Sequence, residues 1–229
     1  MELREALRTT GAVRAFSDAP VPDATIAEIL ETARFAPSGG NRQGWRVVVV
    51  HDADIRRRLR ALYLDGWYEY LAQAGAGLVP WAPITDREAE RAAVAGAPAL
   101  AEAAAAGPGG FAEHLERSPA LLLVLADLRV LAAVDRDFER YTFAGGASVY
   151  PFCWSILLAA RAAGLGGVLT TMAVRSEPAV KALVGAPAEL AVAGLVVLGH
   201  PVHQPSRLTR RPVEAFTTLD RLDGPVLGT

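Results

Sequence analysis

Three short, strongly apolar runs constrain the fold of this chain more than any other feature of its sequence. They span residues 47–50, 121–126 and 190–198. A membrane-spanning helix needs roughly 18 apolar residues, so none of these runs predicts one. Runs of this length are typical of strands that are buried on both faces of a sheet. Because segments with helical character separate them, we predict a layered sheet with helices on both faces and no membrane partner.

The segments around these strands predict a single domain of residues 1–229. Ile26, Ile29 and Leu30 recur with the period of a helix, and the Asp23 carboxylate is expected to cap that helix. Residues 75–110 are rich in Ala, Gly and Pro, which indicates a variable helical region, a lid over a site or a loosely packed connector. Residues 199–229 are expected to form an extended tail. Further helices are expected at 2–9, from 53 onward, at 138–163, where the sequence is nearly all apolar, and at 177–183.

The charge of the chain gives no basis for a nucleic-acid partner. Its formal net charge is −2, and 21% of its residues are charged. The arginines between positions 56 and 60 lie on a predicted helix. We interpret them as a solvated helix face that is directed outward and balanced by nearby acidic residues.

The single cysteine, Cys153, indicates the redox compartment. No intramolecular disulfide can form, which favours a reducing cytoplasm. Cys153 lies in the apolar run 149–154 with no histidine or other base nearby, so we predict an inert core thiol. The N-terminus lacks the apolar run of a signal peptide. We therefore expect a cytoplasmic protein.

The usual catalytic motifs are missing from the sequence. The four histidines lack metal-ligand spacing, and neither a Walker A loop nor a G-x-S-x-G elbow occurs. The stretch Gly164-Leu165-Gly166-Gly167 superficially resembles a dinucleotide-binding loop. It is predicted to follow a helix, however, whereas that loop must follow a strand. We expect neither a metal site nor a Rossmann-type site.

Neutral polar and cationic residues in separate loops remain as candidates for a site. Arginines bind phosphate through paired N–H groups, and amides and hydroxyls suit a ring edged with carbonyls and nitrogens. A set without an acid, base or nucleophile suits a protein whose chemistry is performed by a bound cofactor. The loops carry Thr10 and Arg14; Ser38, Asn41 and Gln43; Thr170 and Thr171; and Arg207, Arg210 and Arg211.

These loops resemble those of the FMN-dependent nitroreductase family, in an NAD(P)H:FMN oxidoreductase-like branch of actinobacterial type. Residues 14–16, Arg-Ala-Phe, are similar to the family's R-x-F motif. Residues 36–45, A-P-S-G-G-N-R-Q-G-W, are similar to A-P-S-x-x-N-x-Q-P-W. Residues 159–166 followed by Thr170-Thr171 resemble the family's flavin-side helix end, and Arg210-Arg211-Pro212 resembles its R-x-P motif. The matches occur in family order over about residues 7–219.

The resemblance implies an α+β fold with a central mixed or antiparallel sheet flanked by helices. It also implies a homodimer with exchanged C-terminal tails and FMN at the subunit interface. The activity it implies is transfer of a hydride from NAD(P)H through FMN to a small, flat, electron-poor acceptor such as a nitroaromatic or quinone.

The family's flavin contacts carry over onto individual positions of this chain. Arg14 would face the N1–C2=O edge of the flavin and support negative charge at N1. Ser38 and Asn41 would reach the flavin from the other subunit, while Gln43 is equally suited to a structural role in that loop. Amides around Thr170 and Thr171 would meet the N5–O4 edge, and Arg210 with Arg211 the phosphate. The full cofactor-binding set expected is Thr10, Arg14, Ser38, Gly39, Asn41, Gln43, Ser148, Leu169, Thr170, Thr171, Arg210 and Arg211.

The chain departs from the family pattern at several positions. Thr10 and Ala12 replace the usual Arg and Ser, Gly44 replaces a proline, and Leu208 replaces a frequent basic residue. We expect weaker FMN binding as a result, with Arg207 or Arg211 compensating. Three alternatives remain open: a flavin-storage protein without turnover, a reductase linked to the deazaflavin F420, and dehalogenation or flavin breakdown on the same scaffold.

Overall fold

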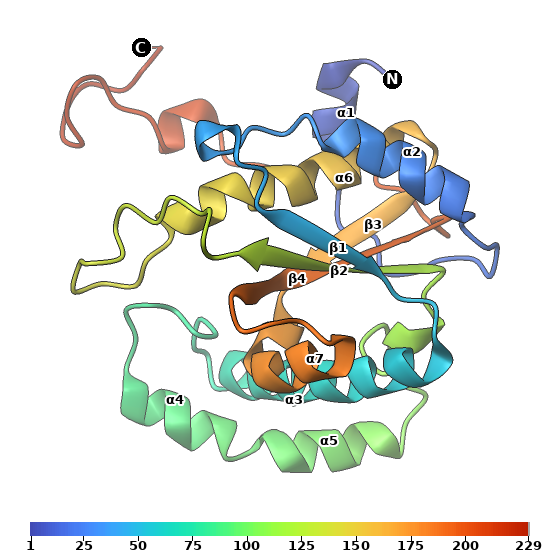
Figure 1. The fold of residues 1–229 in the computed structure, drawn as a ribbon. Coiled ribbons are helices and arrows are strands. Elements are labelled where there is room, and N and C mark those ends of the chain that lie inside the picture. The colour runs from blue at the N-terminus through green and yellow to red at the C-terminus, as the bar shows by residue number, and fades with distance from the viewer. Residues whose placement is uncertain (229) are drawn as a thin grey trace.

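The computed structural model describes residues 1–228 and contains a four-stranded sheet at its centre (Figure 1). The strands lie in the order β1-β2-β4-β3, and every neighbouring pair is antiparallel. The three apolar runs form β1, β2 and β4, as predicted. The bounds are β1 Trp45–Val49, β2 Ala120–Asp127, β3 Gly166–Thr170 and β4 Leu190–Gly199.

Helices cover both faces of the sheet, which confirms the predicted α+β layering (Figure 1). Leu122 and Val124 of β2 join a core with α2 and α6, while Leu121 and Leu123 join a second core with α3 and α7. All eight residues of β2 are buried because both of its faces are covered. The helices are α1 Leu3–Thr9, α2 Asp23–Ala33, α3 Ala53–Gly75, α4 Arg87–Val94, α5 Ala97–Ala105, α6 Tyr150–Ala162 and α7 Glu177–Val184.

The region 75–110 contains α4 and α5, which follow the non-helical residues 76–86 and lie outside α3. Helices α4 and α5 run along the side of α3 that faces away from the sheet (Figure 1). Their packing forms a third, small core of Tyr68, Ala72 and Ala97, and Leu64 and Trp67 of α3 pack against both this core and the second core of the sheet. The contact between helices α4 and α5 and the rest of the protein is therefore made mainly by α3.

The helix expected over 138–163 begins only at Tyr150, so its first half was predicted wrongly. Residues 128–143 form a loop, and Asp135 holds its end together. The buried Asp135 carboxylate accepts hydrogen bonds from the Thr142 hydroxyl at 2.6 Å and from the Phe143 amide at 3.0 Å. These bonds fix a non-helical backbone, and Pro151 stands in the first turn of α6, where proline favours a helix start.

Two predictions about charged side chains were also wrong. Pro22, not Asp23, is the N-cap of α2; Asp23 is already helical, and its carboxylate lies 3.0 Å from Nε2 of His51. Arg56 and Arg60 are half-buried rather than directed outward. Arg56 Nε donates to the Glu116 carbonyl at 2.8 Å because α3 packs against the turn that precedes β2.

Cys153 lies in the core on α6, as predicted, with 0% of its surface exposed. Burial raises the pKa of its thiol to about 12. Since the thiolate is the reactive form, we expect iodoacetamide at pH 8 to leave the folded protein unmodified and to alkylate Cys153 once urea unfolds it. Mass spectrometry of both samples checks this. Rapid labelling of the folded protein would show that α6 opens locally.

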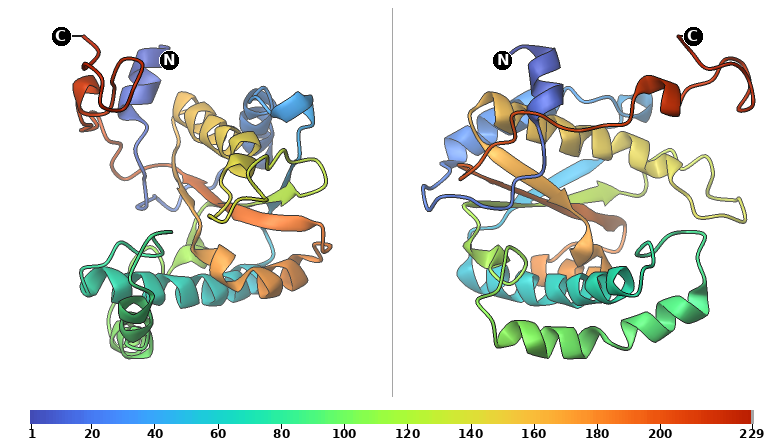
Figure 2. Two further views of the ribbon diagram at one scale, coloured as in Figure 1. Left: turned by 90° about the vertical axis from the view of Figure 1, so that its left-hand side faces the viewer. Right: turned by 180° about the vertical axis from the view of Figure 1, so that it is seen from behind.

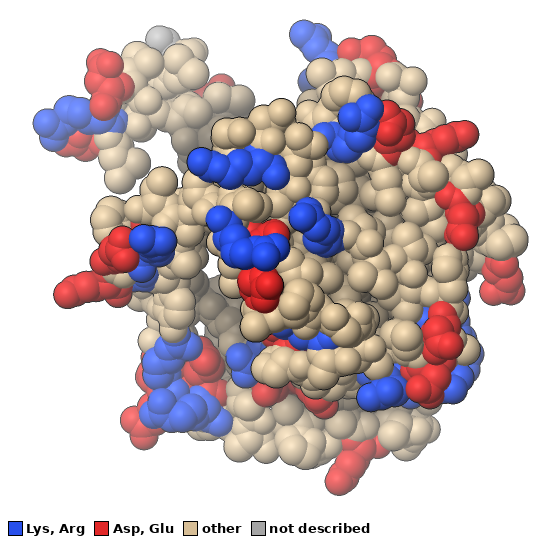
Figure 3. All heavy atoms as spheres, in the orientation of Figure 1, with Lys and Arg blue, Asp and Glu red and all other residues tan. Residues whose placement is uncertain are grey.

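No helix within residues 1–228 is long and apolar enough to cross a membrane. On the face shown in Figure 3, acidic and basic side chains are interspersed. On α3, Arg57 and Arg58 pair with Asp54, at 3.2 and 3.9 Å, as expected of a solvated helix face.

Candidate cofactor site

Four of the predicted site residues line one cavity of about 450 Å³: Arg14, Leu169, Thr170 and Thr171. The fold brings them together in two ways. β3 is an edge strand that ends at Thr170, opposite Leu195 in the middle of β4, so the chain leaves the sheet there. The first loop runs alongside β3 through a bridge between Ala12 and Gly167 and places Arg14 beside this strand end.

Aromatic residues that sequence reasoning missed form another wall of this cavity. Tyr63, Trp67 and Tyr70 lie on α3, and Phe111 faces the same space. Trp67 and Tyr70 stack with ring centroids 5.5 Å apart. The spacing i, i+4, i+7 of the three α3 residues predicts a shared helix face, but it does not distinguish a cavity wall from a core.

Hydrogen-bonding groups lie at the inner end of the cavity. The hydroxyl oxygens of Tyr63 and Thr170 are 3.1 Å apart. Burial raises the pKa of Tyr63, which keeps its hydroxyl protonated at neutral pH. Arg14 is exposed and makes no hydrogen bond or ion pair with residues 1–228. The cavity therefore combines flat apolar walls with a free guanidinium and hydroxyl groups.

Thr10 stands a short distance before Arg14, at the end of α1. It is buried, and its Oγ1 has no hydrogen-bond partner among the described residues. A buried hydroxyl without a partner is costly unless a ligand or water satisfies it. Thr10 is thus a candidate contact for a bound polar group.

A second group of predicted site residues lies at the opposite edge of the sheet. The Gly39 amide donates to the Ser148 hydroxyl at 3.0 Å, and the Gln43 amide donates to the Ser38 hydroxyl at 3.0 Å. Asn41 and Gln43 have positive φ angles of 53° and 50°. For glutamine this conformation is uncommon and indicates a constrained loop.

This loop leads into β1, whereas Arg14 lies beside β3. The two edge strands are three inter-strand spacings apart, each about 4.8 Å. A single chain therefore presents two separated parts of the predicted site.

The tail carries the third group, and it begins against the first loop. Gln204 Nε2 donates to the Thr9 carbonyl at 3.0 Å, and the Leu208 amide donates to the Arg8 carbonyl at 3.1 Å. Beyond this point the tail runs past α1 and away from the body of the protein (Figure 2). Arg210 and Arg211 are exposed there and form no ion pair within the described part of the chain.

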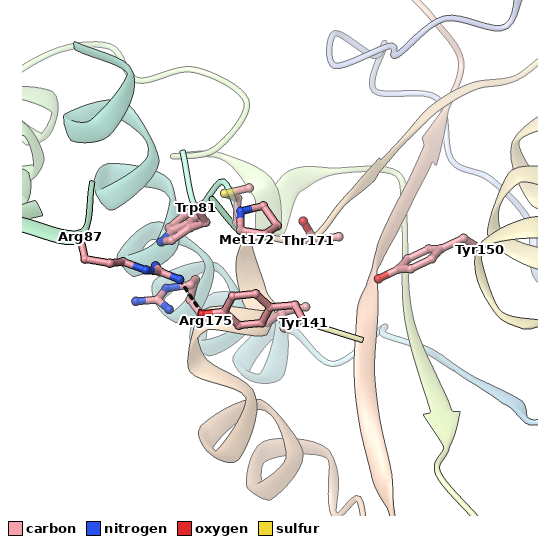
Figure 4. A pocket seen from close by; sticks show the side chains of 9 residues that line it. Trp81, Arg87, Tyr141, Tyr150, Thr171, Met172 and Arg175 are labelled. Carbon is pink, nitrogen blue, oxygen red and sulfur yellow. Dashed lines mark hydrogen bonds between the residues drawn. The ribbon is translucent and has the colours of Figure 1, made fainter. Parts of the chain in front are cut away.

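A second cavity, of about 480 Å³, adjoins the first at Thr171 and Met172 (Figure 4). Trp81 and Arg87 reach it from the region 75–110, and Tyr141 reaches it from the loop before α6. The expectation that 75–110 forms a lid over a site stays a prediction. Sequence reasoning did not identify Trp81, Arg87 or Tyr141 as site residues, because no motif or spacing connects them to the other loops.

Gly66 allows the turn after β3 to approach α3 closely. A Cβ at this position would stand 2.6 Å from the carbonyl oxygen of Met172. Alanine normally stabilises a helix interior relative to glycine by roughly 0.5–1 kcal/mol. Here we expect Gly66→Ala to lower the free energy of unfolding by about 1–3 kcal/mol, because the backbone of the turn must move.

Urea unfolding of Gly66→Ala and Gly75→Ala measures this effect. Gly75 lies at the end of the same helix with nothing within 4 Å of its Cβ position, so its substitution is the matched control. Equal stability of the two variants would contradict the close approach at Met172.

Comparison with known proteins assigns the chain to a family. The model of the nitroreductase family matches residues 7–200. The chain belongs to this family, and its structure is the nitroreductase-like fold that the sequence motifs predicted.

Similar proteins are known under several names. The NADH dehydrogenase of Thermus thermophilus is 31% identical over 202 residues, covering 88% of each chain. Iodotyrosine deiodinase 1 of Homo sapiens is 27% identical over 216 residues, covering 93% of this chain and 66% of the human protein. A BluB-like flavoprotein from Clostridium difficile 630 has a similar fold, with a TM-score of 0.68, 19% identity and coverage of 96% and 100%.

Proposed function

We propose that this protein is an FMN-dependent oxidoreductase that passes a hydride from NAD(P)H to a small, flat, electron-poor acceptor. The observation that carries the proposal is the free guanidinium of Arg14 in an aromatic-walled cavity at the end of β3. The names of relatives add support, since they include an NADH dehydrogenase and an FMN-dependent nitroreductase.

The residues present fit FMN. The flat walls suit a ring system, the Tyr63 and Thr170 hydroxyls and the unsatisfied Thr10 hydroxyl suit its polar groups, and the free arginines suit its anionic parts. When bound, FMN supplies the hydride-transfer chemistry.

The residues of the chain bind and orient the cofactor. We assign Arg14 to the N1–C2=O edge, where its charge stabilises negative charge on the ring, and the Thr170 and Thr171 amides to the N5–O4 edge. We assign Leu169 to the cofactor site as well, because it lines the same cavity as Thr170 and Thr171.

We infer that two copies of the chain complete the site. Ser38, Gly39, Asn41, Gln43 and Ser148 lie at the other sheet edge, so a second copy is needed to bring this group to the Arg14 cavity.

Apolar surface near this loop fits such a dimer. Trp154 on α6 is 39% exposed and Phe143 in the preceding loop is 77% exposed. The tail is the segment that we expect to be exchanged, carrying Arg210 and Arg211 to the phosphate.

The absorption spectrum of the purified protein and its anaerobic reaction with NADH and NADPH test the proposal. We expect a yellow protein whose flavin band bleaches with at least one nucleotide and recovers on adding a nitroaromatic or a quinone. A yellow protein that neither nucleotide bleaches would instead be a storage protein or one linked to the deazaflavin.

Reductive dehalogenation is a second candidate, favoured by the similarity to iodotyrosine deiodinases from several mammals. Release of iodide from 3-iodotyrosine by the reduced protein would support it. Oxidation of the reduced protein by nitroaromatics alone would support the first candidate.

A further inference from the structure

We propose that the second cavity selects acceptors that carry a carboxylate on a flat aromatic ring. The ring packs against Trp81 and Tyr141, and the carboxylate meets Arg87 and Arg175. The selectivity rests on the proposed function, because it concerns the acceptor of that same site. The cavity of about 480 Å³, whose lining Figure 4 shows, shares Thr171 and Met172 with the Arg14 cavity, so an occupant would lie next to the proposed cofactor.

The backbone of Trp81 is strained in a way that places its ring at the cavity. Its φ angle is 51°, in the left-handed region that bulky residues rarely adopt. The Trp81 amide donates to Oε1 of Gln73 at 3.0 Å, and Gln73 is fully buried on α3. A strained residue held by a buried partner is typical of binding sites.

The aromatic surface continues from one cavity to the other. Tyr70, on the wall of the Arg14 cavity, lies 6.3 Å from Trp81 between ring centroids, at an interplanar angle of 44°. A flat molecule therefore has apolar ring contacts on the way from Trp81 to the cofactor site.

The charged residues that line the cavity are cationic, and each of them is also paired with a glutamate. The two are Arg87 and Arg175, and none of the described lining residues is acidic. Their carboxylate partners, Glu90 at 3.0 Å and Glu69 at 2.8 Å, stand outside the lining.

Both guanidinium groups keep hydrogen-bonding capacity and are held in place. Nε of Arg87 and Nη1 of Arg175 have no hydrogen-bond partner among residues 1–228. Arg87 donates to the Tyr141 hydroxyl, and Arg175 lies over the Trp81 ring at 5.3 Å from its centroid (Figure 4).

A planar carboxylate matches the donor geometry of guanidinium groups. The phosphates of a nicotinamide nucleotide share this negative charge, but Arg87 and Arg175 lie directly beside the Tyr141 and Trp81 rings, which suits a charge attached to the flat ring itself. An aromatic acid therefore fits the observations better than a dinucleotide.

Equilibrium binding to the FMN-loaded protein tests the selectivity without requiring turnover. We would titrate 4-nitrobenzoate and 4-nitrobenzamide and follow the flavin absorbance. The wild-type protein should prefer the acid, and the acid-to-amide affinity ratio should fall about tenfold in the double variant Arg87→Gln with Arg175→Gln. Lysine at both positions should recover part of the ratio.

Further variants separate charge from ring packing. Trp81→Leu should weaken both ligands about equally and leave the ratio unchanged. Arg58→Gln is the matched control, because Arg58 is an exposed arginine on α3 that pairs only with Asp54 among the described residues. The single variant Arg87→Gln, on the exposed helix α4, should lower the ratio even if the double variant does not fold.

The outcomes distinguish the selectivity from the proposed function. An equal ratio in the wild-type and arginine variants overturns the selectivity. The selectivity is also overturned if the arginine variants lose affinity for NADPH while the acid-to-amide affinity ratio stays unchanged, because the arginines would then bind nucleotide phosphate. The arginine variants could lower the acid-to-amide affinity ratio even though neither NADH nor NADPH reduces the flavin of the wild-type protein. That result would support the selectivity and contradict the proposed function.

Discussion

Truncation after Leu208 is expected to give a colourless protein that no longer forms a dimer. The shortened chain keeps the hydrogen bonds of Gln204 and Leu208 to the end of α1, so the fold of the body should persist. It loses Arg210, Arg211 and an exposed apolar set, in which Phe216 is 63% exposed. Size-exclusion chromatography with light scattering and the flavin absorbance measure both effects. A truncated protein that remains a yellow dimer would contradict the exchanged tail.

The double variant Arg210→Ala with Arg211→Ala separates the two roles of the tail. It keeps the apolar side chains, so we expect a dimer whose FMN affinity is lowered at least tenfold. The remaining affinity should depend less on salt than that of the wild-type protein, because fewer charge contacts remain to be screened. Arg221→Ala is the matched control in the same tail, where Arg221 pairs with Asp223 at 2.8 Å. If Arg221→Ala lowers the FMN affinity as much as the double variant does, the effect comes from the overall charge of the tail and not from Arg210 and Arg211.

Replacing Arg14 by alanine is expected to slow reduction of the bound flavin by about 10²–10³-fold, equivalent to about 2.7–4 kcal/mol in the transition state. The physical reason is the loss of an unpaired cation in the proposed cofactor cavity. Anaerobic stopped-flow mixing with NADPH measures the rate at saturating FMN. Arg14→Lys keeps the positive charge, so its rate of flavin reduction should fall much less. If Arg14→Ala binds FMN fully and its flavin is reduced at the wild-type rate, the assignment of Arg14 to the N1–C2=O edge of the flavin is wrong.

Much of the central sheet was predictable from the sequence, because strands that are buried on both faces appear as continuous apolar runs. The strands at 47–50, 121–126 and 190–198 follow directly from their apolar runs. The helix expected at 138–163 failed in its first half because isolated apolar side chains do not distinguish a helix from a loop in which charged residues such as Glu139 and Arg140 stand between them. Phe138 and Phe143 lie in such a loop and are exposed in the single chain.

The site was predictable only in part. Arg14, Thr170 and Thr171 were expected together and line one cavity. Tyr63 was not expected there, because it lies 107 residues before its partner Thr170 and its spacing on α3 also suits a core residue. The motif residues at 38–43 lie across the sheet from Arg14, so their place at the cofactor site depends on the second copy that we infer.

The small core beneath α4 and α5 has a consequence for how such proteins diversify. Tyr68, Ala72 and Ala97 connect these helices to α3, and the two cores that stabilise the sheet contain none of them. Leu64 and Trp67 of α3 pack against this core and also against the sheet core on that side, and Trp67 lines the Arg14 cavity. Substitutions in α4 and α5 can therefore change the outer wall of the second cavity freely, except where they move Trp67 and so reach the cofactor site as well.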